Sequence, residues 1–228
     1  MRRSKLKTRV KVCGITRLDD AALALELGAR AIGFIFVKES PRFIEFRKAN
    51  EIMTQLRRMD PLLLGVGVFV NQERSFLDAA ILETGINVLQ LHGEESPADC
   101  ASLKRDYPSI KIFKAARPAL FNDLEALRSY RGCDALLLDT YVPHLSGGSG
   151  ILNDFSLATQ AHQLEIHERI IFSGGLNPQN ILSALQQTQP YAFDVSSGLE
   201  SSPGVKSEEK MQLFFKEIHD FEGEENDK

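Results

Sequence analysis

Two side chains of this sequence, a thiol and a carboxyl, stand where a protein can exchange protons with a ligand. Cys13 follows residues 8–12, whose β-branched pattern predicts a strand, and Gly14 allows a sharp turn directly after it. Asp139 follows the apolar run at residues 135–138, which also predicts a strand. Both side chains therefore lie where a buried strand ends and a loop begins, which is where parallel α/β proteins place their chemistry.

The two groups suit opposite halves of a proton transfer. Burial favours the protonated form of a carboxyl, so Asp139 at an apolar barrel mouth is a candidate general acid. A cation such as Lys11 or Arg42 favours a thiolate, so Cys13 is a candidate general base. The pair predicts isomerisation by proton transfer, with no metal or redox cofactor. No cluster of His, Cys and Asp has the spacing of metal ligands.

Small residues after the last two predicted strands indicate an anion site. Without bulky side chains, backbone N–H groups can approach an anion, and these loops of β/α barrels often hold a phosphate. The predicted phosphate-binding residues are Gly174, Gly175, Ser197 and Gly198. A glycine-rich loop at residues 141–150 contains Gly148 and Ser149, which join this substrate site or form a lid.

Each of these residues also has a purely structural interpretation. A lone cysteine is more often a small buried hydrophobe than a catalyst. Aspartate commonly caps a helix or forms an ion pair, and glycines make tight turns. The case for a site is that small and polar residues stand at the C-terminal ends of all the predicted strands. They are residues 13–14, 40–42, 71–72, 92–93, 114, 139–140, 173–175 and 196–198.

The elements that position these residues alternate along the whole chain. The predicted strands are residues 8–12, 31–36, 63–70, 88–91, 110–115, 135–138, 169–172 and 192–195. The predicted helices begin near residues 18 and 97 or cover residues 46–59, 74–83, 121–130, 154–163, 178–187 and 208–218. Eight strand–helix units without a linker predict an α/β fold, a single (β/α)₈ TIM barrel domain over residues 1–228. The charged tail from about residue 222 is expected to be frayed.

An open, doubly wound sheet is the alternative architecture, because eight parallel strands alone do not prove closure. No G-x-G-x-x-G motif follows the first strand, which favours the barrel.

Composition excludes several classes of protein. The net charge is −4 and no basic stripe appears, so nucleic acid is not an expected partner. No apolar run is long enough to cross a bilayer, so no membrane partner is expected either. The 3 cysteines lack C-x-x-C spacing, which argues against a disulfide framework and a zinc site and fits a reducing cytoplasm. No oligomeric state is predicted.

In its polar segments the sequence resembles the phosphoribosylanthranilate isomerase family of tryptophan biosynthesis. The matching segments are residues 11–16 (KVCGIT), 40–42 (SPR), 67–71 (GVFVN), 89–93 (LQLHG), 138–140 (LDT), 173–180 (SGGLNPQN), 194–200 (DVSSGLE) and 203–206 (PGVK). Around the sixth loop the family tends to have Gly-Gly-Thr-Gly and then Phe-Asp-Trp. Residues 147–150 (GGSG) and 153–155 (NDF) stand there in this chain, so Ser149 keeps the hydroxyl and Asp154 the carboxylate.

The resemblance implies a (β/α)₈ barrel that performs an Amadori rearrangement on a small phosphosugar substrate without a cofactor. By the matched positions, it implies that Asp139 protonates the ribose ring oxygen and that Cys13 removes the proton from C2. It implies that Arg42 binds the anthranilate carboxylate through two parallel hydrogen bonds. The glycine loops are the implied phosphate site.

Two other functions remain open at this point. A related phosphosugar isomerase or epimerase would be expected to carry an aspartate in place of Cys13, or metal ligands. A barrel that binds a phosphosugar as a sensor would not need the pair of Cys13 and Asp139. Turnover of phosphoribosylanthranilate, followed by the loss of its fluorescence, separates an enzyme from a sensor.

Overall fold

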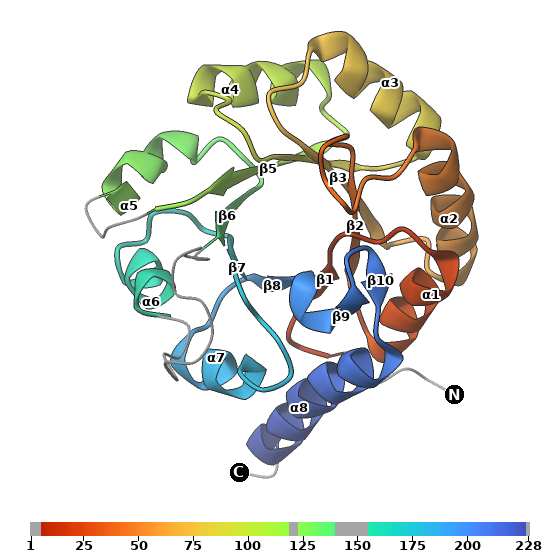
Figure 1. Ribbon diagram of the computed structural model, residues 1–228. Helices are drawn as coiled ribbons and strands as arrows, with labels where there is room; N and C mark the ends of the chain where they lie inside the picture. The colour runs from red at the N-terminus through yellow and green to blue at the C-terminus, as the bar shows by residue number, and fades with distance from the viewer. Residues whose placement is uncertain (1–5, 119–122, 140–154, 227–228) are drawn as a thin grey trace.

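Eight parallel strands form the wall of a closed barrel, and helices surround it (Figure 1). The computed structural model describes residues 6–118, 123–139 and 155–226. The strands are β1 (Val10–Val12), β2 (Ala31–Ile35), β3 (Leu64–Phe69), β4 (Val88–Leu91), β5 (Lys111–Ala116), β6 (Ala135–Asp139), β7 (Ile170–Ser173) and β8 (Ala192–Val195). The α-helices are α1 (Leu18–Leu27), α2 (Phe46–Met59), α3 (Arg74–Thr84), α4 (Pro97–Asp106), α5 (Asp123–Ala126), α6 (Ser156–Gln163), α7 (Ile181–Gln187) and α8 (Glu208–Asn226).

Each strand pairs in parallel with the next strand along the chain, and β8 pairs with β1 to close the ring. The predicted TIM barrel is therefore confirmed, and the open doubly wound sheet is excluded. Because the strands are parallel, their C-terminal ends all meet at one face of the barrel. The residues that follow the strands are gathered at that face.

The strands are apolar along their length because both of their faces are buried. In β6, Ala135 and Leu137 face the barrel interior, whereas Leu136 and Leu138 pack among residues of the surrounding helices. The interior is filled by Ala31, Val66, Val88, Phe113, Ala115, Ala135, Leu137, Ile171 and Ala192. This core closes the barrel in the middle, so the room for a ligand lies above it, at the C-terminal face.

Local sequence signals set the ends of several elements. α2 and β4 have the predicted bounds, residues 46–59 and 88–91. Gly85 ends α3 with a left-handed φ of 72°, as its sequence position predicts. α4 begins with a capping box between Ser96 and Asp99, with Pro97 in its first turn. None of the helices in the described part of the chain is both long and apolar enough to cross a bilayer.

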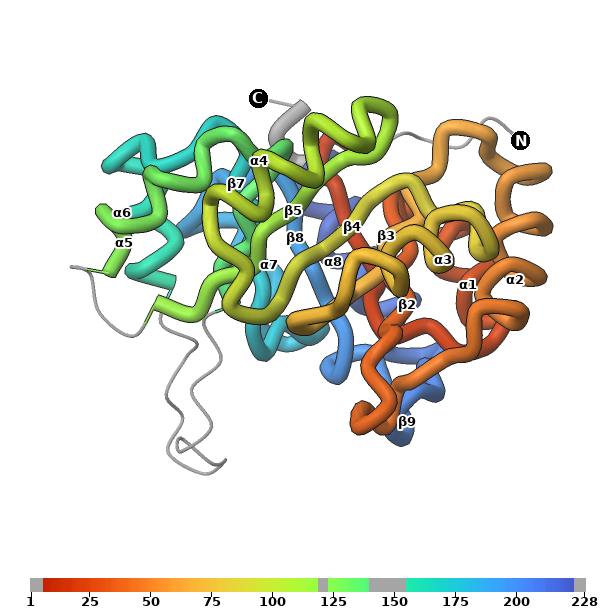
Figure 2. The backbone as a smooth tube through the Cα atoms, turned by 90° about the horizontal axis from the view of Figure 1, so that it is seen from above, coloured from red at the N-terminus to blue at the C-terminus, as the bar shows by residue number. Residues whose placement is uncertain are grey.

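The sequence pattern does not predict the short hairpin that follows β8. It consists of β9 (Glu200–Ser202) and β10 (Val205–Lys206), after the 3₁₀ turn η2 (Ser197–Leu199). Figure 2 shows the barrel from the side, with β9 at one end of it. Gly204 provides the left-handed φ of 79° in the turn, and Thr16 Oγ1 donates to Gly204 O at 2.5 Å. The hairpin is thereby attached to the loop that contains Gly14 and follows β1.

Two predicted helices differ from those of the structure. The helix predicted at residues 121–130 is α5, which continues as the 3₁₀ helix η1 (Leu127–Tyr130). The prediction of a frayed tail from residue 222 is wrong as far as Asn226, where α8 ends. Glu222 accepts hydrogen bonds from the backbone N–H groups of Lys7 (3.0 Å) and Thr8 (2.6 Å), and Phe221 packs against the core. Contacts with the segment that leads into β1 therefore hold a helix end whose composition alone predicts fraying.

Glu222→Ala is expected to lower the free energy of unfolding by about 1 kcal/mol, because two backbone N–H groups lose a charged acceptor. Urea denaturation followed by circular dichroism measures the change. Glu217→Ala, on the same helix, controls for the general effect of removing a carboxylate. Equal urea midpoints for Glu222→Ala and the wild type would show that the hydrogen bonds from Lys7 and Thr8 to Glu222 do not stabilise the fold.

Candidate active site

A cavity of about 270 Å³ opens at the C-terminal ends of the strands. Its lining includes Cys13, Gln90, His92, Arg117, Asp139 and Asp194 from the strand ends, together with the loops after β7 and β8. The structure thus brings the predicted acid and the predicted base to one cavity, from β6 and from the end of β1. Within the described ranges, no three His, Cys, Asp or Glu side chains form a group that could hold a metal ion.

A row of polar residues crosses four adjacent strands at this cavity. The strand register pairs Asp139 of β6 with Ser173 of β7. It pairs Ser173 with Asp194 of β8, and Asp194 with Lys11 of β1. Because the row interrupts an otherwise apolar interior, it marks the layer of the barrel in which chemistry is possible.

Space for the Cys13 side chain comes from a glycine on the neighbouring strand. The backbone N–H of Cys13 donates to Val195 O of β8 at 2.8 Å, which extends the β1 ladder by one residue. A Cβ at Gly33 of β2 would lie 2.8 Å from Cys13 Sγ and 3.0 Å from Lys11 Cε. The missing side chain of Gly33 therefore leaves the room that the thiol and the Lys11 side chain occupy.

Lys11 and Asp194 form a buried ion pair beside the thiol. Lys11 Nζ donates to both carboxylate oxygens of Asp194 at 2.9 Å. Burial raises the pKa of the Cys13 thiol, and this outweighs the opposing charge of Lys11, which Asp194 largely neutralises. The prediction that a neighbouring cation makes Cys13 a thiolate is therefore wrong. Cys13 is a thiol at neutral pH.

The β9–β10 hairpin contacts the backbone of Cys13 through Lys206. The buried Lys206 Nζ donates to Cys13 O at 2.6 Å, to Ser196 O at 3.1 Å and to Glu200 Oε1 at 3.0 Å. Ser196 Oγ also donates to Cys13 O, at 3.1 Å. The backbone N–H of Lys206 donates to Asp20 Oδ2 at 3.0 Å. The carbonyl of Cys13 thus accepts two hydrogen bonds, which fix the backbone that carries the thiol.

Arg42 joins the same network through Glu200. Its Nε donates to Glu200 Oε1 at 2.8 Å and its Nη2 to Oε2 at 2.7 Å. Gly14, with a φ of 73°, lets the chain pass close by, because a Cβ there would lie 2.7 Å from Arg42 Cδ. No described residue accepts a hydrogen bond from Nη1, so this nitrogen is the part of the guanidinium that Glu200 does not use. That Arg42 binds the carboxylate of a ligand stays a prediction.

Two basic side chains hold Asp139. Arg117 Nε donates to Asp139 Oδ2 at 3.0 Å, and His92 Nε2 lies 3.7 Å from the same oxygen. At 3.7 Å the His92 contact is longer than a hydrogen bond, so Arg117 provides the closer of these two contacts to Asp139. Burial acts to raise the pKa of Asp139, but His92 and Arg117 together outweigh it, and the pKa lies below its ordinary value. The prediction that burial keeps Asp139 protonated is therefore wrong, and Asp139 is a carboxylate at neutral pH.

Three of the four residues predicted to bind phosphate line the cavity, namely Gly174, Gly175 and Ser197. Gly174 and Gly175 both have left-handed backbones, with φ of 111° and 61°. At Gly198 a Cβ would collide with Leu176 O in the loop after β7, so the two loops pack closely there, and its role in binding phosphate stays a prediction. The predicted site residues Gly148 and Ser149 lie outside the described residues.

Lys114 is another polar residue near a strand end, but it does not line the cavity. Its Nζ donates to Leu91 O at 3.3 Å, Gly93 O at 2.5 Å and Glu95 Oε2 at 3.0 Å. These contacts secure the loop after β4, so the role of Lys114 is structural.

Known proteins share both the sequence and the fold of this chain. The family model described as N-(5'phosphoribosyl)anthranilate (PRA) isomerase matches residues 10–217. The chain belongs to this family. It is 42% identical over 211 residues to the N-(5'-phosphoribosyl)anthranilate isomerase of Pseudomonas putida strain W619, an alignment that covers 92% of this chain and 97% of that protein.

Solved structures of the isomerase family superpose over most of the chain. The Thermotoga maritima enzyme has a TM-score of 0.82 at 38% identity, covering 93% of this chain and 99% of that one. A phosphoribosylanthranilate isomerase in complex with reduced 1-(o-carboxyphenylamino)-1-deoxyribulose 5-phosphate has a TM-score of 0.80 at 35% identity, with the same coverage. The activity of the chain is the conversion of phosphoribosylanthranilate to 1-(2-carboxyphenylamino)-1-deoxyribulose 5-phosphate in tryptophan biosynthesis.

Sequence reasoning assigned no role to the residues that brace this isomerase site. Glu200 and Lys206 lie in segments that resemble the family, which is the only signal they give. Arg117 lies in no such segment, and its partner Asp139 is 22 residues further along the chain. These roles depend on contacts between distant segments, which local patterns do not encode.

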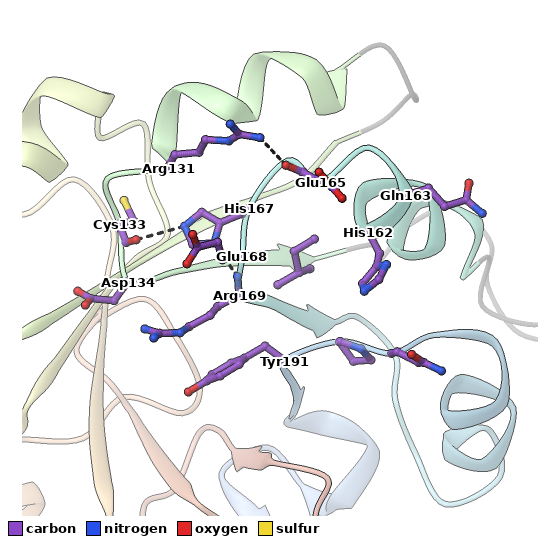
Figure 3. Close-up of a pocket in the computed structure, with 13 residues that line it drawn as sticks. Arg131, Cys133, Asp134, His162, Gln163, Glu165, His167, Glu168, Arg169 and Tyr191 are labelled. Atoms are coloured by element: carbon purple, nitrogen blue, oxygen red, sulfur yellow. Dashed lines mark hydrogen bonds between the residues drawn. The ribbon is translucent and has the colours of Figure 1, made fainter.

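A larger cavity, of about 900 Å³, lies at the opposite end of the barrel (Figure 3). It is formed by residues that precede β6, β7 and β8, which is the face that stabilises such barrels. His167 is held between Cys133 O at 3.2 Å and the backbone N–H of Arg169 at 2.9 Å. Arg131 Nε donates to Ile166 O at 3.2 Å. Because the side chains of His167 and Arg131 bond to the backbone of neighbouring loops, we assign this cavity no catalytic role.

Gly33→Ala is expected to reduce kcat by about tenfold or more and the free energy of unfolding by about 1–3 kcal/mol, because the added methyl displaces Cys13 and Lys11. Gly132→Ala is the matched control, since a Cβ there meets nothing within 4 Å. Steady-state kinetics and urea denaturation of both variants provide the comparison. A fully active Gly33→Ala enzyme would show that the position of the thiol does not matter.

Proposed function

We propose that the isomerase uses Asp139 as its general acid and Cys13 as its general base. The observation that carries this proposal is that both side chains line one cavity from well-separated strands, β6 and the end of β1. A substrate between them can receive a proton at one atom and lose a proton at another. An aldose-to-ketose isomerisation needs those two transfers and no net change in atoms.

The proposed reaction begins at the ribose ring. Asp139 gives a proton to the ring oxygen while the C1–O bond breaks, and the anilino nitrogen lone pair forms the C1=N bond of a Schiff base. The Cys13 thiolate then removes the proton from C2, the electron pair of that C–H bond forms the C1=C2 double bond of an enolamine, and the π pair of the C1=N bond returns to nitrogen. Loss of the C2 hydroxyl proton and protonation of C1 give the ketone, so all atoms of the substrate are kept.

The two anionic ends of the substrate fit two parts of the rim. The left-handed glycine pair at Gly174 and Gly175, with Ser197 beside it, supports a phosphate site after β7 and β8. The end of the Arg42 guanidinium that Glu200 does not use supports a site for the anthranilate carboxylate after β2. Binding of the reduced product by a relative of 35% identity is consistent with such a cavity.

The proposed roles require a proton to move before chemistry. Asp139 is a carboxylate at neutral pH and Cys13 is a thiol, because their pKa values are shifted down and up, respectively. In the reactive pair Asp139 is a carboxylic acid and Cys13 is a thiolate. The pair carries one proton in both forms, on Cys13 at rest and on Asp139 when it reacts. The reaction therefore proceeds through a minor arrangement of the same total charge, in which Asp139 carries the proton and Cys13 does not.

We place this reaction in the cytoplasm. We also propose that residues 1–228 form a single domain. The three cysteines are free thiols, as a reducing compartment would keep them.

Cys13→Ala and Asp139→Asn should each lower kcat by about 10²–10⁴-fold, the usual cost of losing a general base or acid. Binding of the reduced product analogue, measured by calorimetry, should change little. Cys100→Ala and Asp106→Asn remove the same groups from α4 and serve as controls. Wild-type turnover by either site variant would remove that residue from its proposed role.

The pH profile follows from the shared proton. Between the lowered pKa of Asp139 and the raised pKa of Cys13, the number of protons on the pair is constant, so kcat/KM should be flat from about pH 6 to about pH 9. It should fall at higher pH, where the pair loses its proton. A rise of kcat/KM through pH 7 to 8 would instead mean that Cys13 must lose its proton to solvent, contrary to this proposal.

A further inference from the structure

The two buried polar side-chain atoms that have no hydrogen-bond partner among the described residues both come from one short segment. They are Gln90 Oε1 on β4 and His92 Nε2 directly after it. Both residues line the cavity that holds Cys13 and Asp139. His92 Nε2 has the charged oxygen of Asp139 at 3.7 Å, whereas nothing in the described protein compensates Gln90 Oε1.

Gln90 is an exception in its surroundings. Its side chain is 1% exposed, and the strand register places it between Val68 of β3 and Phe113 of β5. An apolar residue would fill this position without burying an unpaired acceptor, which is costly in a protein interior. The backbone of Gln90 is already held in the β4 ladder, so its amide is not required to hold the strand. An unpaired buried acceptor in a substrate cavity is explained if the substrate completes it.

We propose that Gln90 is a substrate-binding residue, whose Oε1 accepts a hydrogen bond from the uncharged middle of the substrate. An amide oxygen needs a donor, and the phosphate and carboxylate ends offer acceptors only. The donors of phosphoribosylanthranilate are its sugar hydroxyls and its anilino N–H. Gln90 therefore reads the segment between the two anions, next to the atoms at which protons are transferred. This inference rests on the proposed function for its ligand, although not for the roles of Cys13 and Asp139.

A stability measurement separates this role from a structural one. Gln90→Met keeps the approximate size of the side chain and removes the unpaired oxygen. The melting temperature of the variant should be unchanged or raised, while the Kd for the reduced product analogue rises about tenfold, as expected for one lost hydrogen bond. Gln55→Met, at an exposed position on α2, is the matched control and should change neither quantity.

Analogues identify the donor. If a sugar hydroxyl donates, an analogue lacking that hydroxyl should bind wild type and Gln90→Met equally; if the anilino N–H donates, the same should hold for an ether-linked analogue. Three results would overturn the proposal: unchanged analogue affinity in Gln90→Met, a clearly lowered melting temperature or failure to fold, or an affinity loss that persists with every analogue. Wild-type turnover of phosphoribosylanthranilate is measured separately, so a failure of the proposed function would be visible on its own.

Discussion

The buried charges around Cys13 are the interaction on which the rest of the site depends. Lys11 binds Asp194 on one side of the thiol, and Lys206 binds Glu200 and the Cys13 carbonyl on the other. Removing one member of such a buried pair leaves an uncompensated charge and typically costs about 3–5 kcal/mol. The network therefore ties β1, β8 and the β9–β10 hairpin into one unit, and the thiol can project from it in only a narrow range of positions.

Different groups on the two sides of the cavity set the resting protonation states of Cys13 and Asp139. Because Asp194 takes up the charge of Lys11, burial dominates at the thiol and raises the pKa of Cys13. At the opposite side of the cavity, Arg117 gives Asp139 a charged donor at 3.0 Å and helps to lower its pKa. Under the proposed mechanism, each group therefore rests in the form opposite to the one that reacts. Between the two pKa values the proposed pair carries one proton in total, so the fraction in the reactive form does not change with pH.

The sequence predicted the barrel well, because the alternation of strands and helices follows from local patterns. α2 has its predicted bounds because its amphipathic pattern stops before Pro61. β4 has its predicted bounds because its apolar run is short and clearly delimited. Cys13 and Asp139 were singled out because they follow barrel strands, and the structure places both at one cavity, while their catalytic roles stay a prediction.

What the sequence could not supply depends on distant contacts. The Lys206 Nζ contact with the Cys13 carbonyl joins residues 193 positions apart, and the tether from Glu222 to Thr8 joins residues 214 apart. The predicted directions of the pKa shifts of Cys13 and Asp139 were wrong for the same reason. The shifts depend on Asp194, His92 and Arg117, which are distant in sequence. Gln90 was unmarked because an unpaired oxygen is visible only when all its surroundings are known.

The protonation state of Cys13 at neutral pH tests the central claim most directly. Infrared spectroscopy detects the S–H stretching band of a thiol, and the band of Cys13 is identified by its loss in Cys13→Ser. We expect this band to be present at pH 7 and to disappear only above the ordinary pKa of a cysteine. Absence of the Cys13 band at pH 7 would show a resting thiolate and contradict the claim that burial, rather than Lys11, controls the base.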